Sequence, residues 1–265
     1  MRGFSLHLAL AWTAFATATL WLALVGTVVV APNAAQGIVA LGLAQVAAYG
    51  LVLAFFQRVN GGGAREMFAL HRVSPVLCIS SALLGFTLQL PATLVSDVIE
   101  RLFPPPPGQL TEHLARITPH STAQAVAIFV VVAGLGPMVE ELLFRGALFG
   151  ALRRGHDAFV TAVAIALLFA VAHLDARSLV PLFLVALVIG NLRERSGSIW
   201  PGIALHGAFN AATLVVVFMG AAPNGKSPEI PVKFAILCCA CCASLFVTTR
   251  RLALSSRVAQ NRSQS

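Results

Sequence analysis

Long stretches of apolar residues make up most of this chain, and each is interrupted by few charged side chains. A helix of about 20 mainly apolar residues is long enough to cross the hydrocarbon core of a bilayer. Such stretches occupy residues 8–31, 36–57, 76–96, 122–151, 158–174, 179–192, 199–219 and 233–249. Backbone polar groups in lipid must bond within their own segment, so each stretch is expected to be helical. The sequence therefore predicts an all-α, polytopic transmembrane bundle of about eight helices.

The composition excludes an ordinary water-soluble domain. Charged residues make up 11% of the chain and hydrophobic residues 58%, whereas soluble domains contain about 25% charged residues. So few charges cannot cover a water-facing surface. The first apolar stretch follows Arg2, as in a secretory signal peptide, but it is too long for the usual apolar core of such a signal. We therefore expect it to be retained as a helix.

The positions of the basic residues indicate how the bundle is oriented. With the N-terminus inside, the inner segments hold twelve basic residues and the outer segments hold five. The inner set is Arg2, Arg58, Arg65, Arg72, Arg153, Arg154, Arg193, Arg195, Arg250, Arg251, Arg257 and Arg262; the outer set is Arg101, Arg116, Arg177, Lys226 and Lys233. Since Lys and Arg are enriched in cytoplasmic loops, both termini are predicted to be cytoplasmic.

The net charge of +8 does not indicate nucleic-acid binding. The basic residues lie between the apolar stretches and form no single basic face or tail, which is typical of topology determinants. The chain has far more Arg than Lys, a weak indication of a bacterial source. The expected location is therefore the bacterial cytoplasmic membrane, where the chain contacts membrane lipid.

Six polar or ionisable residues lie inside or at the end of the predicted spans. They are Glu140, Glu141 and Arg145 in the fourth span, His173 at the end of the fifth, and His206 and Asn210 in the seventh. A charged side chain at mid-bilayer costs about 2.5–3.5 kcal/mol on insertion scales. Such residues face the protein interior and mark functional sites by default, with a structural polar network between helices as the alternative.

Helical spacing separates the roles of the two glutamates. Glu141 and Arg145 are four residues apart and share a face, so an ion pair is expected. Glu140 points about 140° away from Arg145, because each residue of an α-helix turns by about 100°. Glu140 therefore lacks a built-in counter-ion and is a candidate general base. Phe169 and His173, like His206 and Asn210, are also four residues apart.

Pro137 lies just before the two glutamates, with Gly136 and Gly134 close by. Proline lacks an amide hydrogen and clashes with the preceding helical turn, so a kink is expected there. A kink leaves carbonyl groups that water or neighbouring side chains must satisfy. The sequence thus predicts an opening in the helix beside Glu140.

Three short motifs in this region resemble those of a known family. The stretch from Glu140 to Arg145 is similar to the EExxxR motif of the CAAX protease and bacteriocin-processing (Abi-type) family. Phe169 to His173 resembles its FxxxH motif, and His206 to Asn210 its HxxxN motif. The motifs occur in the family's order, within predicted spans, and the resemblance covers about residues 122–219.

The resemblance implies an eight-helix membrane fold and an intramembrane peptidase of the CAAX prenyl endopeptidase type. Glu140 matches the glutamate that activates water, and His173 the histidine that helps to orient that water. His206 and Asn210 match the residues that stabilise the oxyanion. Glu141 and Arg145 match a supporting pair, and Phe169 supports His173. The implied substrate is a peptide or membrane protein.

A metal is left open by the motifs. Glu140, His173 and His206 would supply a zinc ligand set of two histidines and one glutamate, but no HExxH motif is present. A metal-bound Glu140 would also need a different base. The expectation is a metal-free glutamate mechanism that requires no cofactor, with zinc as the alternative.

Two other function classes remain compatible with the same residues. A transporter or proton relay would also use buried Glu, His and Arg side chains. A non-catalytic scaffold or bacteriocin-immunity protein would not depend on Glu140 or His206.

The expected organisation is one membrane domain with three parts. Residues 1–121 contribute three helices and an external loop, 122–219 form the catalytic core, and 220–265 form the last helix and a cytoplasmic tail. Four consecutive prolines make the external loop 97–121 a stiff spacer. The polar tail after Arg250 is expected to be disordered.

Overall fold

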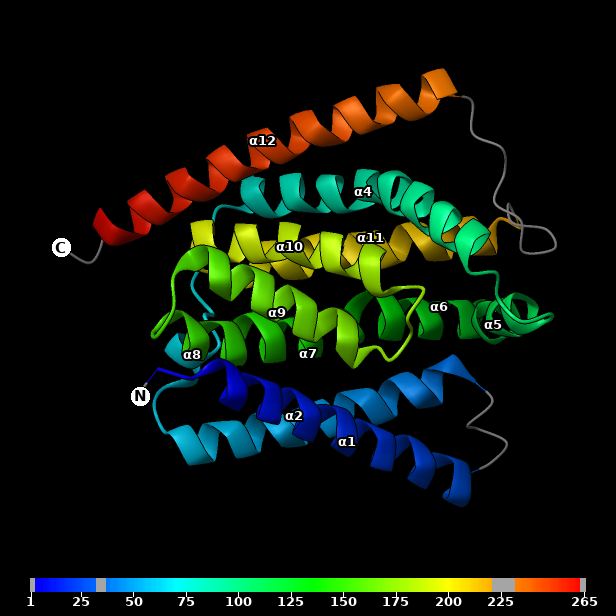
Figure 1. The fold of residues 1–265 in the computed structure, drawn as a ribbon, viewed down its shortest axis with the longest axis horizontal. Coiled ribbons are helices and arrows are strands. Elements are labelled where there is room, and N and C mark those ends of the chain that lie inside the picture. The colour runs from blue at the N-terminus through cyan, green and yellow to red at the C-terminus, as the bar shows by residue number, and fades with distance from the viewer. Residues whose placement is uncertain (1–2, 32–36, 221–231, 263–265) are drawn as a thin grey trace.

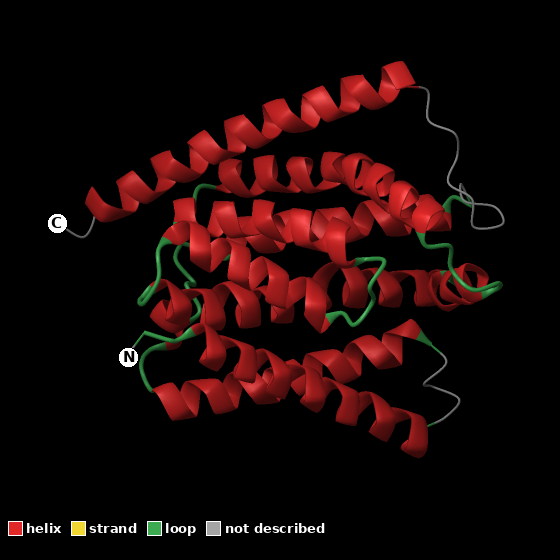
Figure 2. Ribbon diagram, in the orientation of Figure 1, coloured by secondary structure: helices red, strands yellow, loops and turns green. Residues whose placement is uncertain are grey.

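A computed structural model describes residues 3–31, 37–220 and 232–262 of the chain. Two residues used for the topology prediction, Arg2 and Lys226, lie outside this described part. Figure 2 shows helices joined by loops, with no strand in the described ranges. The predicted all-helical, polytopic membrane fold is confirmed.

Every predicted span coincides with a helical segment. Seven of these segments are single helices: α1 (Leu6–Val30), α2 (Ile38–Asn60), α4 (Pro75–Leu102), α9 (Ala158–Ala172), α10 (Leu179–Ser196), α11 (Trp200–Phe218) and α12 (Val232–Arg262). The remaining span is a continuous rod built from α6 (Thr122–Phe129), η2 (Val130–Leu135), α7 (Gly136–Glu141), η3 (Leu142–Leu148) and α8 (Phe149–Arg153). The segments η2 and η3 are π-helical.

By length and composition, six of these helical segments can cross a membrane. They are α1, α2, α4, the rod of residues 122–153, α11 and the 235–258 part of α12. The helix α9 is apolar but has only 15 residues, which gives a length of about 22 Å. The helix α10 carries Arg193, Glu194 and Arg195 in its last turns. Eight crossings therefore stay a prediction.

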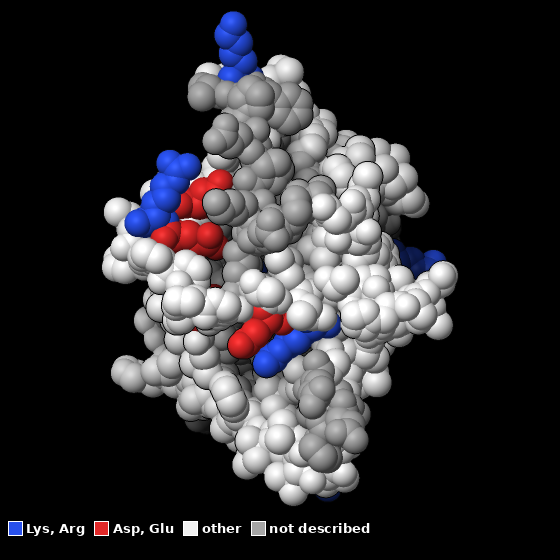
Figure 3. Space-filling model, turned by 90° about the vertical axis from the view of Figure 1, so that its right-hand side faces the viewer, with Lys and Arg blue, Asp and Glu red and all other residues white. Residues whose placement is uncertain are grey.

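The ends of the helices fall into two groups at opposite ends of the bundle. The start of α1 and the end of α12 lie at the same end, on the left in Figure 1. The loop between α8 and α9 also lies there, whereas the loop between α9 and α10 lies toward the other end. That other end shows acidic and basic side chains on a largely uncharged surface (Figure 3). This arrangement agrees with an even number of crossings, while the cytoplasmic side stays a prediction.

Two predicted connections differ from the structure. The expectation of a disordered tail after Arg250 is wrong, because α12 continues to Arg262. Ala253 is fully buried there, and the Arg257 guanidinium pairs with the Glu194 carboxylate at 3.7 Å. In the loop 97–121, α4 extends to Leu102 and a short helix, α5 (Gln109–Ile117), follows the prolines. A further short helix, α3 (Ala64–Met67), lies between α2 and α4.

Buried apolar side chains form two clusters. One joins α1, α2, α9 and the rod of residues 122–153, and the other joins α4, α10, α11 and α12. Glycines allow the backbones of neighbouring helical segments to approach closely. A Cβ on Gly85 of α4 would lie 2.1 Å from the Leu205 carbonyl oxygen of α11, and one on Gly207 would lie 2.6 Å from the Ala133 carbonyl oxygen of η2. Small residues serve this purpose in membrane bundles.

Candidate active site

The rod of residues 122–153 changes its backbone hydrogen bonding at Pro137. The Gly136 amide donates to the Val131 carbonyl oxygen in π-helical register, and Pro137 has no amide hydrogen to donate. The Val132 carbonyl oxygen therefore loses both its α-helical and its π-helical donor. Asn210 of α11 supplies the replacement, since its Nδ2 donates to the Val132 oxygen at 2.9 Å. The carbonyl that Pro137 frees thus fixes one of the predicted site residues.

The predicted ion pair between Glu141 and Arg145 is confirmed. The Arg145 Nη1 group donates to Glu141 Oε1 at 2.8 Å, and both side chains are fully buried. A second Arg145 nitrogen, Nη2, donates to the Ala186 carbonyl oxygen at 3.2 Å. The Arg145 guanidinium also lies over the Phe169 ring, 4.6 Å from its centroid. These contacts lock the pair between the rod, α9 and α10.

His206 joins the two glutamates. Its Nδ1 lies 3.0 Å from Glu141 Oε1, and its Nε2 lies 3.7 Å from Glu140 Oε2. A carboxylate oxygen only accepts hydrogen bonds, so Nδ1 must carry the hydrogen. In a neutral His206 ring, Nε2 is therefore unprotonated and faces Glu140. Glu141 thus orients His206 in addition to pairing with Arg145.

Glu140 is nearly buried and has a partner that the motifs do not contain. The amide of Gln45, on α2, donates through Nε2 to Glu140 Oε1. Glu140 therefore lies between this neutral donor and His206, while the Arg145 guanidinium binds Glu141. This agrees with the expectation that Glu140 has no built-in counter-ion.

His173 ends α9, and its ring lies at the edge of the site. Its Nδ1 is 2.8 Å from the Phe169 carbonyl oxygen, so this nitrogen carries the hydrogen and Nε2 is unprotonated in the neutral ring. The next residue, Leu174, has φ of 53°, a left-handed conformation that is costly for a branched side chain. The Phe169 ring packs between the two histidines, 4.7 Å from His173 and 5.8 Å from His206.

A cavity of about 340 Å³ connects these groups. Glu140, His173 and Asn210 line it together with Gln45 and Tyr49. Its apolar wall comes from α1, α2 and the rod, and includes Leu20, Trp21, Leu24, Ile38, Leu41, Val131 and Pro137. The cavity volume is in the range of small-molecule sites. The structure therefore brings a carboxylate, an imidazole and a carboxamide to one apolar-walled space.

The ligands named for the zinc alternative are not gathered into a metal site in this conformation. No group of three or more His, Cys, Asp or Glu side chains in the described ranges is arranged to hold a metal ion. Glu140 and His206 approach each other, and the Nδ1 hydrogen bonds of His206 and His173 leave an unprotonated Nε2 on each ring, as in histidines that bind metals. The chemistry of Glu140, His173 and His206 is therefore compatible with zinc, whereas their spacing in this conformation is not that of a metal site.

The motifs do not include two α2 residues that shape the site. Gln45 and Tyr49 lie on α2, outside the motifs, and both line the cavity. An uncharged but strongly polar Gln45 in the middle of an apolar span was the available signal. Gly202 of α11 packs against the buried pair, since a Cβ there would lie 3.1 Å from Glu141 Oε2.

Comparison with known proteins identifies the region that carries these residues. Residues 122–212 match the family described as Type II CAAX prenyl endopeptidase Rce1-like. The chain is also similar to the protein named "Putative membrane peptidase YdiL" of Bacillus subtilis (strain 168), with 30% identity over 95 residues. That alignment covers 36% of this chain and 38% of the relative. No solved structure matches the chain.

The matched segment contains all seven residues that the motifs identify, from Glu140 on α7 to Asn210 on α11. The part of the chain that carries the site is therefore similar, over residues 122–212, to the CAAX prenyl endopeptidases and to a membrane peptidase.

Proposed function

We propose that this protein is an intramembrane endopeptidase that hydrolyses a peptide bond of a peptide or membrane-protein substrate. The observation that supports this proposal is the meeting of Glu140, His173 and Asn210 in one cavity, with His206 next to Glu140. These groups are the kinds that amide hydrolysis requires: a base, a proton carrier and hydrogen-bond donors for an oxyanion.

The first step is attack of water on the scissile carbonyl carbon. Glu140 takes one proton from a water in the cavity, and the resulting hydroxide forms the new C–O bond. The unprotonated Nε2 of His173 accepts the second hydrogen of the same water and so orients it. The Gln45 hydrogen bond holds Glu140 Oε1, which directs the other carboxylate oxygen toward His206 and the water.

The second requirement is stabilisation of the oxyanion on the former carbonyl oxygen. A neutral His206 cannot donate from Nε2, because its hydrogen is held on Nδ1 by Glu141. We infer that Glu140 passes the water proton to His206 Nε2 across their 3.7 Å separation. The Glu141 carboxylate stabilises the resulting imidazolium, which then donates to the oxyanion. The second Asn210 amide hydrogen, which is not directed to Val132, adds a further donor.

The tetrahedral intermediate collapses when its C–N bond breaks. The leaving nitrogen takes the proton that Glu140 and His206 have shared, so the products are a new carboxyl group and a new amine. The proton taken from water is thereby returned, and the side chains regain their starting protonation. The reaction consumes one water for each peptide bond.

The proposed mechanism is metal-free. A chelation experiment on active, purified protein tests this point: activity that survives removal of bound metal supports the glutamate mechanism. Loss of activity that zinc restores would instead require Glu140, His173 and His206 to rearrange around a metal.

The central experiment replaces Glu140 with glutamine. Membranes carrying the wild type are compared with membranes carrying Glu140→Gln by quantitative proteomics, and an uncleaved protein should accumulate with the variant. Glutamine keeps the hydrogen bond with Gln45 but cannot accept the water proton. Glu112→Gln, at an exposed site on α5, is the matched control. Identical cleavage products from both variants would overturn the proposal and favour a scaffold or transporter.

A further inference from the structure

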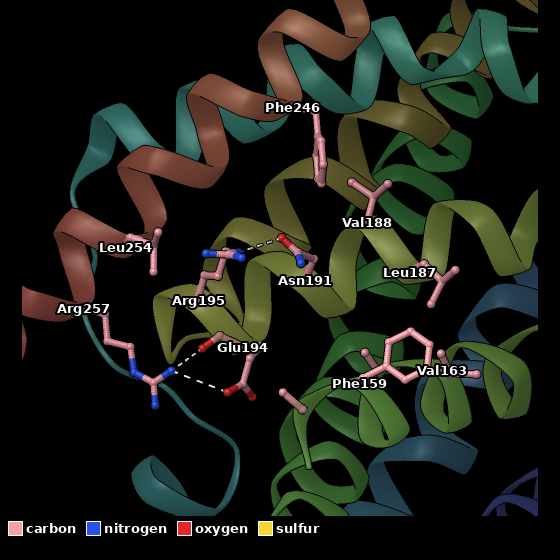
Figure 4. A pocket seen from close by; sticks show the side chains of 12 residues that line it. Phe159, Val163, Leu187, Val188, Asn191, Glu194, Arg195, Phe246, Leu254 and Arg257 are labelled. Carbon is pink, nitrogen blue, oxygen red and sulfur yellow. Dashed lines mark hydrogen bonds and ion pairs between the residues drawn. The ribbon is translucent and has the colours of Figure 1, made fainter.

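A second cavity lies on the other side of α10 from the site. Its volume is about 600 Å³, and it shares no lining residue with the cavity at Glu140. Figure 4 shows α10 along its base, with side chains of α9 on one side and of α12 on the other. The apolar lining consists of Ala158, Phe159, Ala162, Val163, Leu187, Val188, Phe246 and Leu254. We refer to this cavity as the α9–α12 groove.

The walls of the groove are suited to a hydrocarbon chain. Phe159 is 77% exposed and Leu254 is 43% exposed, so both present apolar surface to a hydrocarbon environment. Among the lining residues, polar side chains come only from Asn191, Glu194, Arg195 and Arg257, which lie at one end of the groove (Figure 4). The groove thus has a long apolar part and a short charged part.

The charged part carries more positive than negative charge. Glu194 pairs with Arg153 at 3.0 Å and with Arg257 at 3.7 Å. The Nε of Arg195 donates to the neutral amide oxygen of Asn191 at 3.1 Å, and Arg250 of α12 acts electrostatically on the same guanidinium. Arg195, Arg257 and Glu194 thus line this end of the groove, and Arg153 and Arg250 lie beside them. An anionic group between α10 and α12 would offset the excess positive charge.

The groove matches an anionic phospholipid in layout. Its charged end corresponds to the head group, and its apolar part corresponds to the acyl chains. Basic pockets between transmembrane helices on the cytoplasmic side bind the head groups of anionic lipids. The arginines of the groove lie at the end of the bundle that the basic residues predict to be cytoplasmic. We propose that the α9–α12 groove binds one anionic phospholipid, with an acyl chain along α10 and the phosphate at Arg195 and Arg250.

This binding is separate from the chemistry at Glu140. None of the residues that we assign to peptide hydrolysis lines the groove. The inference therefore does not depend on the proposed peptidase activity, and its test has a readout other than cleavage.

The test measures lipid binding to the full-length protein by native mass spectrometry. Detergent-solubilised protein is titrated with phosphatidylglycerol and, separately, with phosphatidylcholine. The wild type should bind one phosphatidylglycerol in preference to phosphatidylcholine. The double variant Arg195→Gln/Arg250→Gln should bind phosphatidylglycerol about 25-fold more weakly, at about fivefold for each arginine. Its matched control is Arg101→Gln/Arg116→Gln, which removes two arginines at the opposite end and should bind like the wild type.

A second variant tests the apolar part of the groove. Val163→Trp should fill the space beside Phe159 and reduce binding of both lipids, whereas Val29→Trp, on the exposed face of α1, should not. If Val163→Trp fails to fold, the arginine variants decide the question. Equal binding of the two lipids, or equal loss in the Arg195 and Arg101 double variants, would overturn the proposal. The proposal would also be overturned if the protein formed a lipid-free dimer that Val163→Trp disrupts, because the groove would then be a protein interface.

Discussion

At the scale of single residues, Glu141 connects the structural and the chemical parts of the site. One of its oxygens accepts hydrogen bonds from both Arg145 and His206. The motif spacing accounts for the first bond, because the two residues share a helical face. The second bond crosses from the rod to α11 and fixes the hydrogen of His206 on Nδ1. A residue that spacing identifies as a support therefore also determines which nitrogen of His206 can take a proton.

Loss of one partner of the buried pair should destabilise the protein strongly. The variant Glu141→Leu leaves the fully buried Arg145 without its carboxylate, and uncompensated buried charges cost about 3–5 kcal/mol. Thermal unfolding in detergent measures this loss. The double variant Glu141→Leu/Arg145→Met should recover much of the stability, because both charges are gone, yet stay inactive because His206 has lost its orienting partner. A double variant less stable than Glu141→Leu would contradict this account.

The Gln45 side chain should matter for activity more than for folding. Replacing Gln45 with Leu removes the hydrogen bond to Glu140, and bonds to charged groups contribute about 1.5–3 kcal/mol. If that energy positions the base, cleavage should slow by about tenfold to a hundredfold. Accumulation of uncleaved substrate reports the rate. Gln57→Leu, on the same helix but outside the cavity, should cleave normally, and equal rates for both variants would remove Gln45 from the mechanism.

At the scale of elements, the π-helical segment η2 and α11 form one unit. Pro137 deprives the Val132 oxygen of a backbone donor, and Asn210 provides one from α11. Because Gly207 has no side chain, the two backbones can approach closely enough for this bond. Local sequence determines that a carbonyl is freed, while the packing of a distant helix determines how it is satisfied.

The variant Gly207→Ala should separate these two elements. Its Cβ would lie 2.6 Å from the Ala133 oxygen, which is rigid backbone, and overpacking of this kind costs about 1–3 kcal/mol. The expected results are a lower unfolding temperature and reduced cleavage, since both His206 and Asn210 move with α11. Gly134→Ala is the control, because nothing lies within 4 Å of a Cβ there. Equal unfolding temperatures for the two variants would show that the close approach is dispensable.

At the scale of the whole molecule, the site lies where two apolar clusters meet. Phe169, Phe144 and Leu143 belong to the cluster with α1 and α2, whereas Leu205 belongs to the cluster with α4, α10 and α12. Glu140 and Glu141 come from the first side and His206 from the second. Helices outside the matched segment 122–212 therefore help to build the cavity, as the Gln45 and Tyr49 side chains of α2 show.

The orientation of the molecule in the membrane can be tested directly. A reporter protein that is active only in the cytoplasm should be active when fused to either terminus, because the basic residues follow the positive-inside rule. A reporter that is active only outside the cytoplasm should be active when it is inserted in the loop before α5. Opposite locations for the two termini would refute the eight-span topology, even though the helices themselves would be unaffected.

The sequence by itself determined the helices, the ion pair and the set of polar residues from Glu140 to Asn210. These features follow from local rules: apolar length sets a membrane helix, and residues four apart share its face. The continuation of α12 to Arg262 was missed because it depends on contacts with α10, such as the bond from Arg257 to the Glu194 oxygen. Composition after Arg250 carries no sign of that partner.

Only the tertiary structure decided how these residues combine. The Gln45 bond to Glu140 joins positions 95 residues apart, and the His206 bond to Glu141 joins positions 65 apart. Spacing along one helix cannot fix such pairs, because they depend on how separate helices rotate and slide when they pack. The protonation pattern of His206 and the excess of arginines in the α9–α12 groove arise in the same way, from charges that meet only in the folded bundle.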